Sequence, residues 1–235
     1  MKKMILFLLS IVCLQTYAQR PGDMTQGVLN ELVPFNKKVT QRHGTNYLTP
    51  GWNKGKVWVE YQGKIQELDE LKLRFDMGNQ QLEIKVHNTI SNKASVKVLY
   101  DQHVTKFEYT DGESQEKVYF ERCKNFKTKT PMLGFFRVLY KGDKVSLLVK
   151  IASYVQKGNE VKALGIGSAN QRVIRKDAYF MTQNGKTFKI KRRKKSILKQ
   201  FGDKQAQVKS YVKENKLYYK KEKDLIAIFK YYEGL

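Results

Sequence analysis

Ser196 and Lys199 are the two residues whose spacing comes nearest to a catalytic motif in this sequence. The Ser-x-x-Lys spacing is that of penicillin-binding enzymes and β-lactamases, in which the serine hydroxyl attacks an acyl carbon outside the cytoplasm. The companion Ser-Asp-Asn and Lys-Thr-Gly elements are missing, and the surrounding Lys and Arg residues are typical of a solvated helix face. A cell-envelope hydrolase therefore stays an alternative that rests on this spacing alone, and no catalytic residue is predicted.

Cys123 lies between Arg122 and Lys124, two cations that can lower the pKa of a neighbouring thiol. A nucleophilic cysteine also needs a positioned base, and the neighbouring sequence supplies none. We therefore interpret Cys123 as a half-buried structural cysteine rather than as a reactive one.

Two further patterns suggest a metal site and a phosphate-binding loop. His43, His87 and His103 could meet around a metal, but their spacing matches no zinc motif. Residues 185–187 read Gly-Lys-Thr, as at the end of a P-loop, but Phe180 stands where that motif requires a glycine. The sequence therefore predicts neither a metal nor a cofactor.

The chain of 235 residues carries 45 Lys and Arg against 22 Asp and Glu, a formal net charge of +23. Residues 186–235 hold 16 of the basic residues and 5 of the acidic ones, and several tyrosines are interleaved with them. Cations next to aromatic rings are typical of surfaces that bind nucleic acid, anionic lipid or polysaccharide. The residues predicted to contact such a surface are Lys191, Arg192, Arg193, Lys194, Lys195 and Lys199.

The first eighteen residues have the layout of a secretory signal peptide. Lys2 and Lys3 precede an apolar run from Met4 to Leu14, and Thr16 and Ala18 are the small residues that a signal peptidase reads. The apolar run is shorter than the ~20 residues that a membrane-spanning helix needs. We therefore expect cleavage after Ala18, export to the periplasm or beyond, and no transmembrane segment in the mature chain.

Residues 46–191 are expected to form an antiparallel β domain. Apolar residues recur there at every second position, as in half-buried strands. Asp111-Gly112 and Asn184-Gly185 are typical hairpin turns, and residues 165–168 are interpreted as a loop between strands. Because such a sheet must hide its apolar face, we expect a meander curled into a barrel-like or two-layered body. The segments with this alternation are 57–61, 82–86, 96–98, 105–109 and 118–120. Residues 135–140 and 145–151 are apolar on both faces, as in a hairpin in the middle of the sheet, and residues 178–181 and 187–190 flank the Asn184-Gly185 turn.

Residues 192–235 are expected to form a basic helical tail of about three short helices, so that the fold class is α+β. Apolar residues there recur at helical spacing, and Asp203 is a suitable N-cap for the middle helix. Helices this short are not stable in isolation, so we expect them to pack on the sheet. Residues 19–45 are interpreted as an N-terminal lead with a short helix from Met24 to Leu32.

Several short motifs resemble an uncharacterised family of exported proteins that is common in Bacteroidetes. The likeness covers most of the mature chain and implies export and architecture, but no known activity. Asp76 stands where the family more commonly has Asn. The segments that carry it are Gly44–Leu48, Trp52, Gly55–Val57, Leu73–Asp76, Leu82–Glu83, Gly134–Leu139 and Tyr231–Leu235.

These observations favour an exported, non-enzymatic binding or structural protein of the bacterial envelope. Its partner would be an anionic or amphipathic envelope component or another protein, and nucleic acid is not expected outside the cytosol. A lipid-carrying module with an apolar cavity is a second interpretation, since a curved sheet can enclose one. The plainest reading of the basic tail is a solvated face that keeps an exported protein soluble.

Overall fold

In the computed structural model, the described residues are 33–34, 44–88, 93–158 and 170–235, with only the backbone described at 33–34, 87–88 and 93. The expected signal peptide, the helix expected from Met24 to Leu32, and the loop at 165–168 lie outside these ranges. Residues 32–235 belong to one compact unit.

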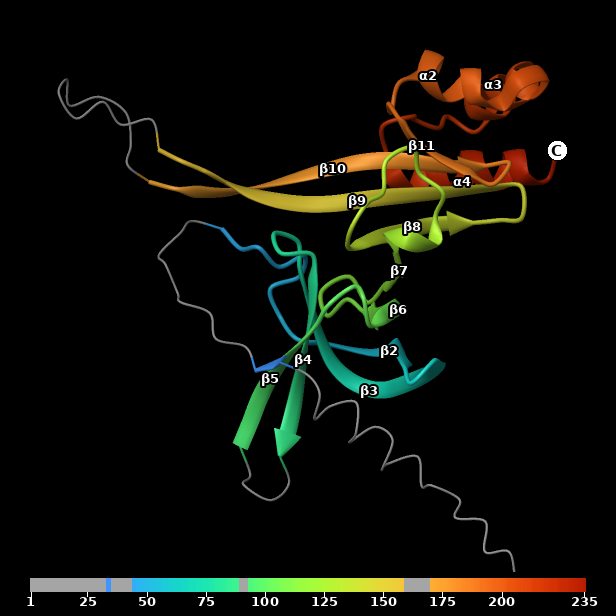
Figure 1. Ribbon diagram of the computed structural model, residues 1–235. Helices are drawn as coiled ribbons and strands as arrows, with labels where there is room; N and C mark the ends of the chain where they lie inside the picture. Colours follow the sequence, from blue (N-terminus) through green and yellow to red (C-terminus); the bar gives the residue numbers. More distant parts are fainter. Residues whose placement is uncertain (1–32, 35–43, 89–92, 159–169) are drawn as a thin grey trace, which may run out of the picture. The chain divides into compact units, whose positions relative to one another are not determined.

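The described strands form one antiparallel sheet, which confirms the predicted fold class (Figure 1). It consists of two meanders, β2 to β5 and β6 to β11, joined by the pairing of β2 with β6. Each strand pairs with its neighbour in the order β1-β5-β4-β3-β2-β6-β7-β8-β9-β10-β11, so that β1 and β11 are the two ends and the described pairings do not close the sheet. The strands are β1 (Val33–Pro34), β2 (Asn53–Tyr61), β3 (Lys64–Asp76), β4 (Gln81–Asn88), β5 (Lys93–Leu99), β6 (Val104–Thr110), β7 (Lys117–Arg122), β8 (Phe135–Lys141), β9 (Val145–Gln156), β10 (Arg172–Gln183) and β11 (Lys186–Ile190).

The predicted turns connect these strands. Asn184 and Gly185, at φ 49° and 70°, join β10 to β11 with the two positive φ values of a type I′ hairpin turn. Residues 185–187 therefore belong to this hairpin and not to a phosphate-binding loop. Between β6 and β7, the Asp111 carboxylate accepts hydrogen bonds from the backbone N–H groups of Glu113 and Ser114, each at 2.9 Å.

Buried aromatic rings show that the sheet curls. Phe75 on β3 and Phe135 on β8 have ring centroids 6.1 Å apart, although β2, β6 and β7 separate their strands in the sheet order. In a flat sheet those strands would lie about 19 Å apart, since neighbouring strands are spaced by about 4.8 Å. Phe107 and Phe120 fill the space between them, stacked at 4.5 Å.

The C-terminal segment packs on the sheet through α4, which contacts β8 and β9. Leu225, Ile228 and Phe229 are its buried face, and the Phe229 ring meets Phe201 edge-on at 5.6 Å. The helices are η1 (Cys123–Asn125), α2 (Lys194–Leu198), η3 (Lys199–Lys204), α3 (Gln205–Glu214) and α4 (Glu222–Glu233).

The expected N-cap at Asp203 is wrong. Lys204 occupies the N-cap position of α3, and no side chain caps that end. The cause is Gly202, whose φ of 54° and ψ of −125° kink the chain within η3. This kink leaves Asp203 inside the last turn of the 3-10 helix, where its carboxylate is 3.8 Å from the Lys204 ammonium.

Polar contacts hold α4 at both ends. Glu222, in its first turn, accepts hydrogen bonds from the Arg137 guanidinium and the Tyr179 hydroxyl, each at 3.0 Å. At the other end, the Glu233 carboxylate accepts backbone N–H groups of Asp143 and Lys144 at 2.9 Å each, and of Val145 at 3.1 Å. These three donors belong to the turn between β8 and β9, so a single carboxylate ties the end of the helix to that turn.

We expect Glu233 to make the stability of the fold depend on acid pH. Burial raises the pKa of Glu233, but the three backbone donors outweigh it and hold that pKa below its ordinary value. A folded-state pKa below the unfolded value stabilises the fold above about pH 5, and this contribution disappears as the pH falls through the lowered pKa. Urea unfolding of wild type and Glu233→Gln should therefore differ by about 1 kcal/mol at neutral pH and converge once the pH falls below the lowered pKa. A difference that does not change with pH would contradict this assignment.

Candidate functional site

The six predicted contact residues do not all have the same surroundings. Lys191, Arg193, Lys195 and Lys199 are exposed, and none of them forms an ion pair with another described residue. Arg192 instead lies partly buried. Its guanidinium donates to the Lys220 carbonyl at 2.6 Å and lies 4.1 Å from the centre of the Tyr179 ring, so it fastens the tail to β10.

Lys194, the remaining predicted residue, lines a hollow of about 410 Å³ between α2, α3 and the segment that follows α3. Lys209 and Lys213 lie one helical turn apart on α3 and therefore point to the same side of that helix. We call this feature the lysine hollow. Its lining consists of Lys194, Lys209, Lys213, Lys216, Val212, Leu217, Tyr218 and Tyr219.

The lysine hollow is strongly electropositive. Four of the residues that line it are lysines, and none of its described lining residues is a carboxylate. Three of the tail's five carboxylates are engaged in internal contacts: Glu222 and Glu233 hold α4 to the sheet, and Asp224 accepts the backbone N–H of Tyr218, itself a lining residue, at 2.8 Å. The ammonium charges around the hollow are therefore left available to an anion from outside.

Two tyrosines add aromatic surface to the lysine hollow. Tyr218 is 59% exposed, and the Lys221 ammonium lies 4.4 Å from the centre of its ring. The Tyr219 hydroxyl is buried without a hydrogen-bond partner among the described residues, and this burial raises its pKa. The site thus combines a set of cations with an exposed ring, which suits an amphipathic anion better than a small inorganic one.

Sequence reasoning found one lysine of this hollow and missed three. The continuous basic run drew attention to 191–195, whereas Lys209, Lys213 and Lys216 are separated by other residues. The signal that could have found them is their spacing of four and three, which brings side chains together on one side of a helix and its following turn.

The Ser196 and Lys199 pair is not assembled as a catalytic site. Lys199 is exposed at the start of η3, and the hydrogen bonds described for these two residues do not join them. The Ser196 backbone carbonyl accepts the Gln200 side-chain amide at 3.2 Å, an ordinary contact within one helical turn.

Cys123 is a buried structural residue, as its 1% exposure indicates. Burial raises the pKa of its thiol to about 11, even though the Lys150 ammonium is 3.5 Å from the sulfur. The flanking Arg122 and Lys124 do not activate it. The prediction of a half-buried cysteine underestimated the burial, because η1 turns the side chain into the cluster of Phe136, Leu148 and Phe180.

The histidines are not brought together around a metal in the part of the chain that the structure describes. His103 is exposed next to the Gln102 amide, whereas His43 and the side chain of His87 lie outside the described atoms. No group of three His, Cys, Asp or Glu side chains suited to a metal occurs among the described residues. Within the same ranges, no helix has the length and apolar content needed to cross a bilayer.

Comparison with protein-family models, with curated proteins and with solved structures finds no match for this chain.

Proposed function

We propose that this protein is an exported, non-enzymatic binding protein of the bacterial envelope, and that the lysine hollow holds the phosphate headgroup of an anionic lipid. The observation that carries the proposal is the convergence of four lysines around one hollow that no carboxylate lines in the described structure. The N-terminal sequence, with its basic, apolar and small-residue regions, supports a location where such headgroups are exposed.

The tail has the two components that an interfacial site needs. Lysines close to an anionic membrane surface each contribute about 1 kcal/mol of attraction. An exposed ring such as that of Tyr218 lies well at the boundary between headgroups and acyl chains. Glu222, Glu233 and Arg192 hold the tail to the sheet, so the backbone that carries these lysines is in place before a ligand arrives.

The test is co-sedimentation of the purified protein with vesicles that contain phosphatidylglycerol, compared with vesicles of phosphatidylcholine only. We expect binding to the anionic vesicles at low salt and a steep loss as salt is added. Replacing Lys209 and Lys213 with Gln should weaken it by about 30-fold, because two lost contacts of about 1 kcal/mol each correspond to that factor.

A matched control separates the hollow from net charge. Lys72 and Lys85 are exposed, face each other across β3 and β4, and lose the same charge when both become Gln. This control pair should bind vesicles within about threefold of wild type. Equal losses in the two double variants, or no binding at low salt, would contradict the proposal. Competition by soluble glycerol phosphate would show whether the headgroup phosphate is sufficient or the membrane surface is needed.

A further inference from the structure

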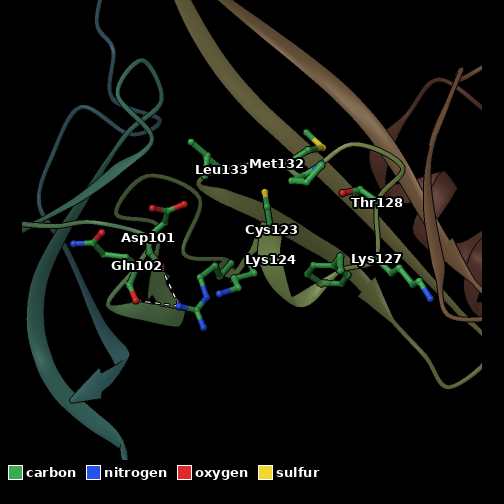
Figure 2. Close-up of a pocket in the computed structure, with 11 residues that line it drawn as sticks. Asp101, Gln102, Cys123, Lys124, Lys127, Thr128, Met132 and Leu133 are labelled. Atoms are coloured by element: carbon green, nitrogen blue, oxygen red, sulfur yellow. Dashed lines mark hydrogen bonds between the residues drawn. The ribbon is translucent and has the colours of Figure 1, made fainter. Parts of the chain in front are cut away.

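A second cavity lies on the β domain, away from the lysine hollow and without any shared residue. It has a volume of about 590 Å³, within the range of small-molecule sites, and it is formed where β7 ends and the irregular segment 123–133 begins (Figure 2). We call it the side pocket. Its lining consists of Asp101, Gln102, Arg122, Cys123, Lys124, Phe126, Lys127, Thr128, Pro131, Met132 and Leu133.

One side of the side pocket is apolar. Phe126 and Met132 pack against the buried cluster that contains Cys123, and the Phe126 ring meets Phe136 edge-on at 5.5 Å. Leu133 is 81% exposed, more than any other large apolar side chain in the described structure. Leaving such a side chain in water costs free energy that an apolar ligand would recover.

The wall that presents these side chains is fixed by several polar contacts. The Lys150 ammonium donates to the Leu133 carbonyl and to the Gln80 side-chain oxygen. Next to it, the Gly134 backbone N–H donates to the Asp101 carboxylate at 2.6 Å, and the Gly134 carbonyl accepts the Cys123 N–H at 2.8 Å. The pocket is therefore formed before any ligand arrives.

The other side of the side pocket is positively charged. The Arg122 guanidinium donates to the backbone carbonyl of Gln102 at 3.1 Å, and the nearest carboxylate that it meets is Glu60, 49% exposed, at 3.4 Å. The Arg122 Nε atom is buried and has no partner among the described residues. Lys124 and Lys127 are exposed and form no ion pair within the described ranges.

We infer that the side pocket binds an amphipathic carboxylate, such as a medium-chain fatty acid. The carboxylate head would lie next to Arg122 and Lys124, and the chain would cover Phe126, Met132 and Leu133, whereas the Lys127 side chain points away from Lys124 (Figure 2). The lining contains three cations but only Asp101 as an anion, and that carboxylate already accepts a backbone hydrogen bond. A carboxylate therefore fits the charge better than an alcohol or an amine with the same chain.

The experiment uses a dansyl-labelled undecanoate, whose emission rises and shifts to the blue in an apolar site. Decanoate should displace this probe at a concentration at least tenfold lower than decanol, which has the same chain without the charge. In a spectrum of isotope-labelled methionine methyl groups, decanoate should shift Met132. Met77 and Met181, which are buried and do not line the pocket, should stay in place.

Leu133→Glu should weaken probe binding at least tenfold, because it places a carboxylate in the path of the ligand. Its matched control is Ile65→Glu, which introduces the same charge at another apolar side chain, 65% exposed on β3. Both positions are exposed, so both variants should fold. Replacing Lys124 with Gln should raise the concentration of decanoate needed for displacement and leave that of decanol unchanged.

The test of the side pocket can be separated from the test of the lysine hollow. The Lys209→Gln, Lys213→Gln double variant should bind the probe like wild type, and Leu133→Glu should bind anionic vesicles like wild type. The inference is overturned if decanol competes as well as decanoate, if Leu133→Glu and Ile65→Glu bind alike, or if Met132 does not shift.

Discussion

Replacing Glu83 with Gln should lower the free energy of unfolding by about 3–5 kcal/mol, because it removes one partner of a buried ion pair. Glu83 has no exposed surface. Its carboxylate accepts two hydrogen bonds from the Arg74 guanidinium, at 3.1 Å and 2.6 Å, and one from the Tyr47 hydroxyl at 3.0 Å. The Gln side chain has the same shape, so the loss measures the charge that is left on Arg74 without a partner.

The aromatic rings around Arg74 shield its ion pair with Glu83 from water. The centre of the Tyr47 ring lies 3.7 Å from the guanidinium carbon, and the centre of the Trp52 ring lies 4.4 Å from it. Burial and the Glu83 charge next to it raise the pKa of the Tyr47 hydroxyl. Tyr47 and Trp52 precede β2, whereas Arg74 and Glu83 lie on β3 and β4, so the cluster holds the start of the described chain against the sheet.

Glu67→Gln is the control for this prediction, since it removes the same charge from an exposed ion pair. Glu67 is 3.0 Å from Lys56, and its side chain is 44% exposed. That substitution should cost less than about 1 kcal/mol. Urea unfolding followed by circular dichroism gives both values. A loss at Glu83 no larger than the loss at Glu67 would show that the buried pair contributes no more than a surface pair.

The cluster also brings together four of the short motifs that the sequence contains. Gly44–Leu48 supplies Tyr47, and the separate motif at Trp52 supplies the second ring. Leu73–Asp76 and Leu82–Glu83 supply the two charges of the ion pair. Residues that are far apart in the sequence thus meet in one structural contact, which their spacing could not reveal.

Alternation of apolar residues predicted the strands with one clean buried face, and the structure confirms these. It did not predict β3, because a bulge interrupts the alternation. Leu68 pairs with Val57, but Leu71 pairs with Gly55, so that Asp69 and Glu70 together face a single residue of β2. This extra residue moves the buried positions from even to odd numbers, and a period of two disappears from the sequence.

The outer halves of β9 and β10 show no alternation of apolar residues in the sequence, for a different reason. Residues 152–156 pair with 172–176 along their whole length, but most of their side chains are exposed or only partly buried. Backbone hydrogen bonds, which any residue can make, hold these segments together. Sequence periodicity detects burial, and there is little burial here to detect.

The two candidate sites also differ in how far the sequence could predict them. A continuous run of basic residues is visible in sequence, and it led to Lys194 at the edge of the lysine hollow. The side pocket was not visible, because residues 126–133 have no periodicity. Their positions depend on long-range contacts such as the hydrogen bond from the Thr187 N–H to the Lys127 carbonyl at 2.8 Å.

Phe107→Ala should destabilise the fold by about 3–5 kcal/mol, as large truncations in a packed core do. Phe107 is 1% exposed and contacts rings from three other strands. Phe120 stacks on it at 4.5 Å, Phe135 meets it edge-on at 5.1 Å, and Phe75 lies at 5.8 Å. Because β3 and β8, which carry Phe75 and Phe135, are not neighbours of β6 in the sheet order, this ring helps to hold the sheet in its curled form and not merely to fill one face.

The control is Tyr119→Ala on β7, which removes an aromatic ring that is 44% exposed. That change should cost less than about 1 kcal/mol, since nearly half of the Tyr119 surface stays in water when the protein folds. The two variants are compared by urea unfolding, and the slope of the free energy against urea should be the same as in wild type if both still fold completely. If Phe107→Ala and Tyr119→Ala destabilise the protein equally, the aromatic cluster does not hold the curled sheet together, and the contact between β3 and β8 must depend on the surrounding aliphatic residues instead.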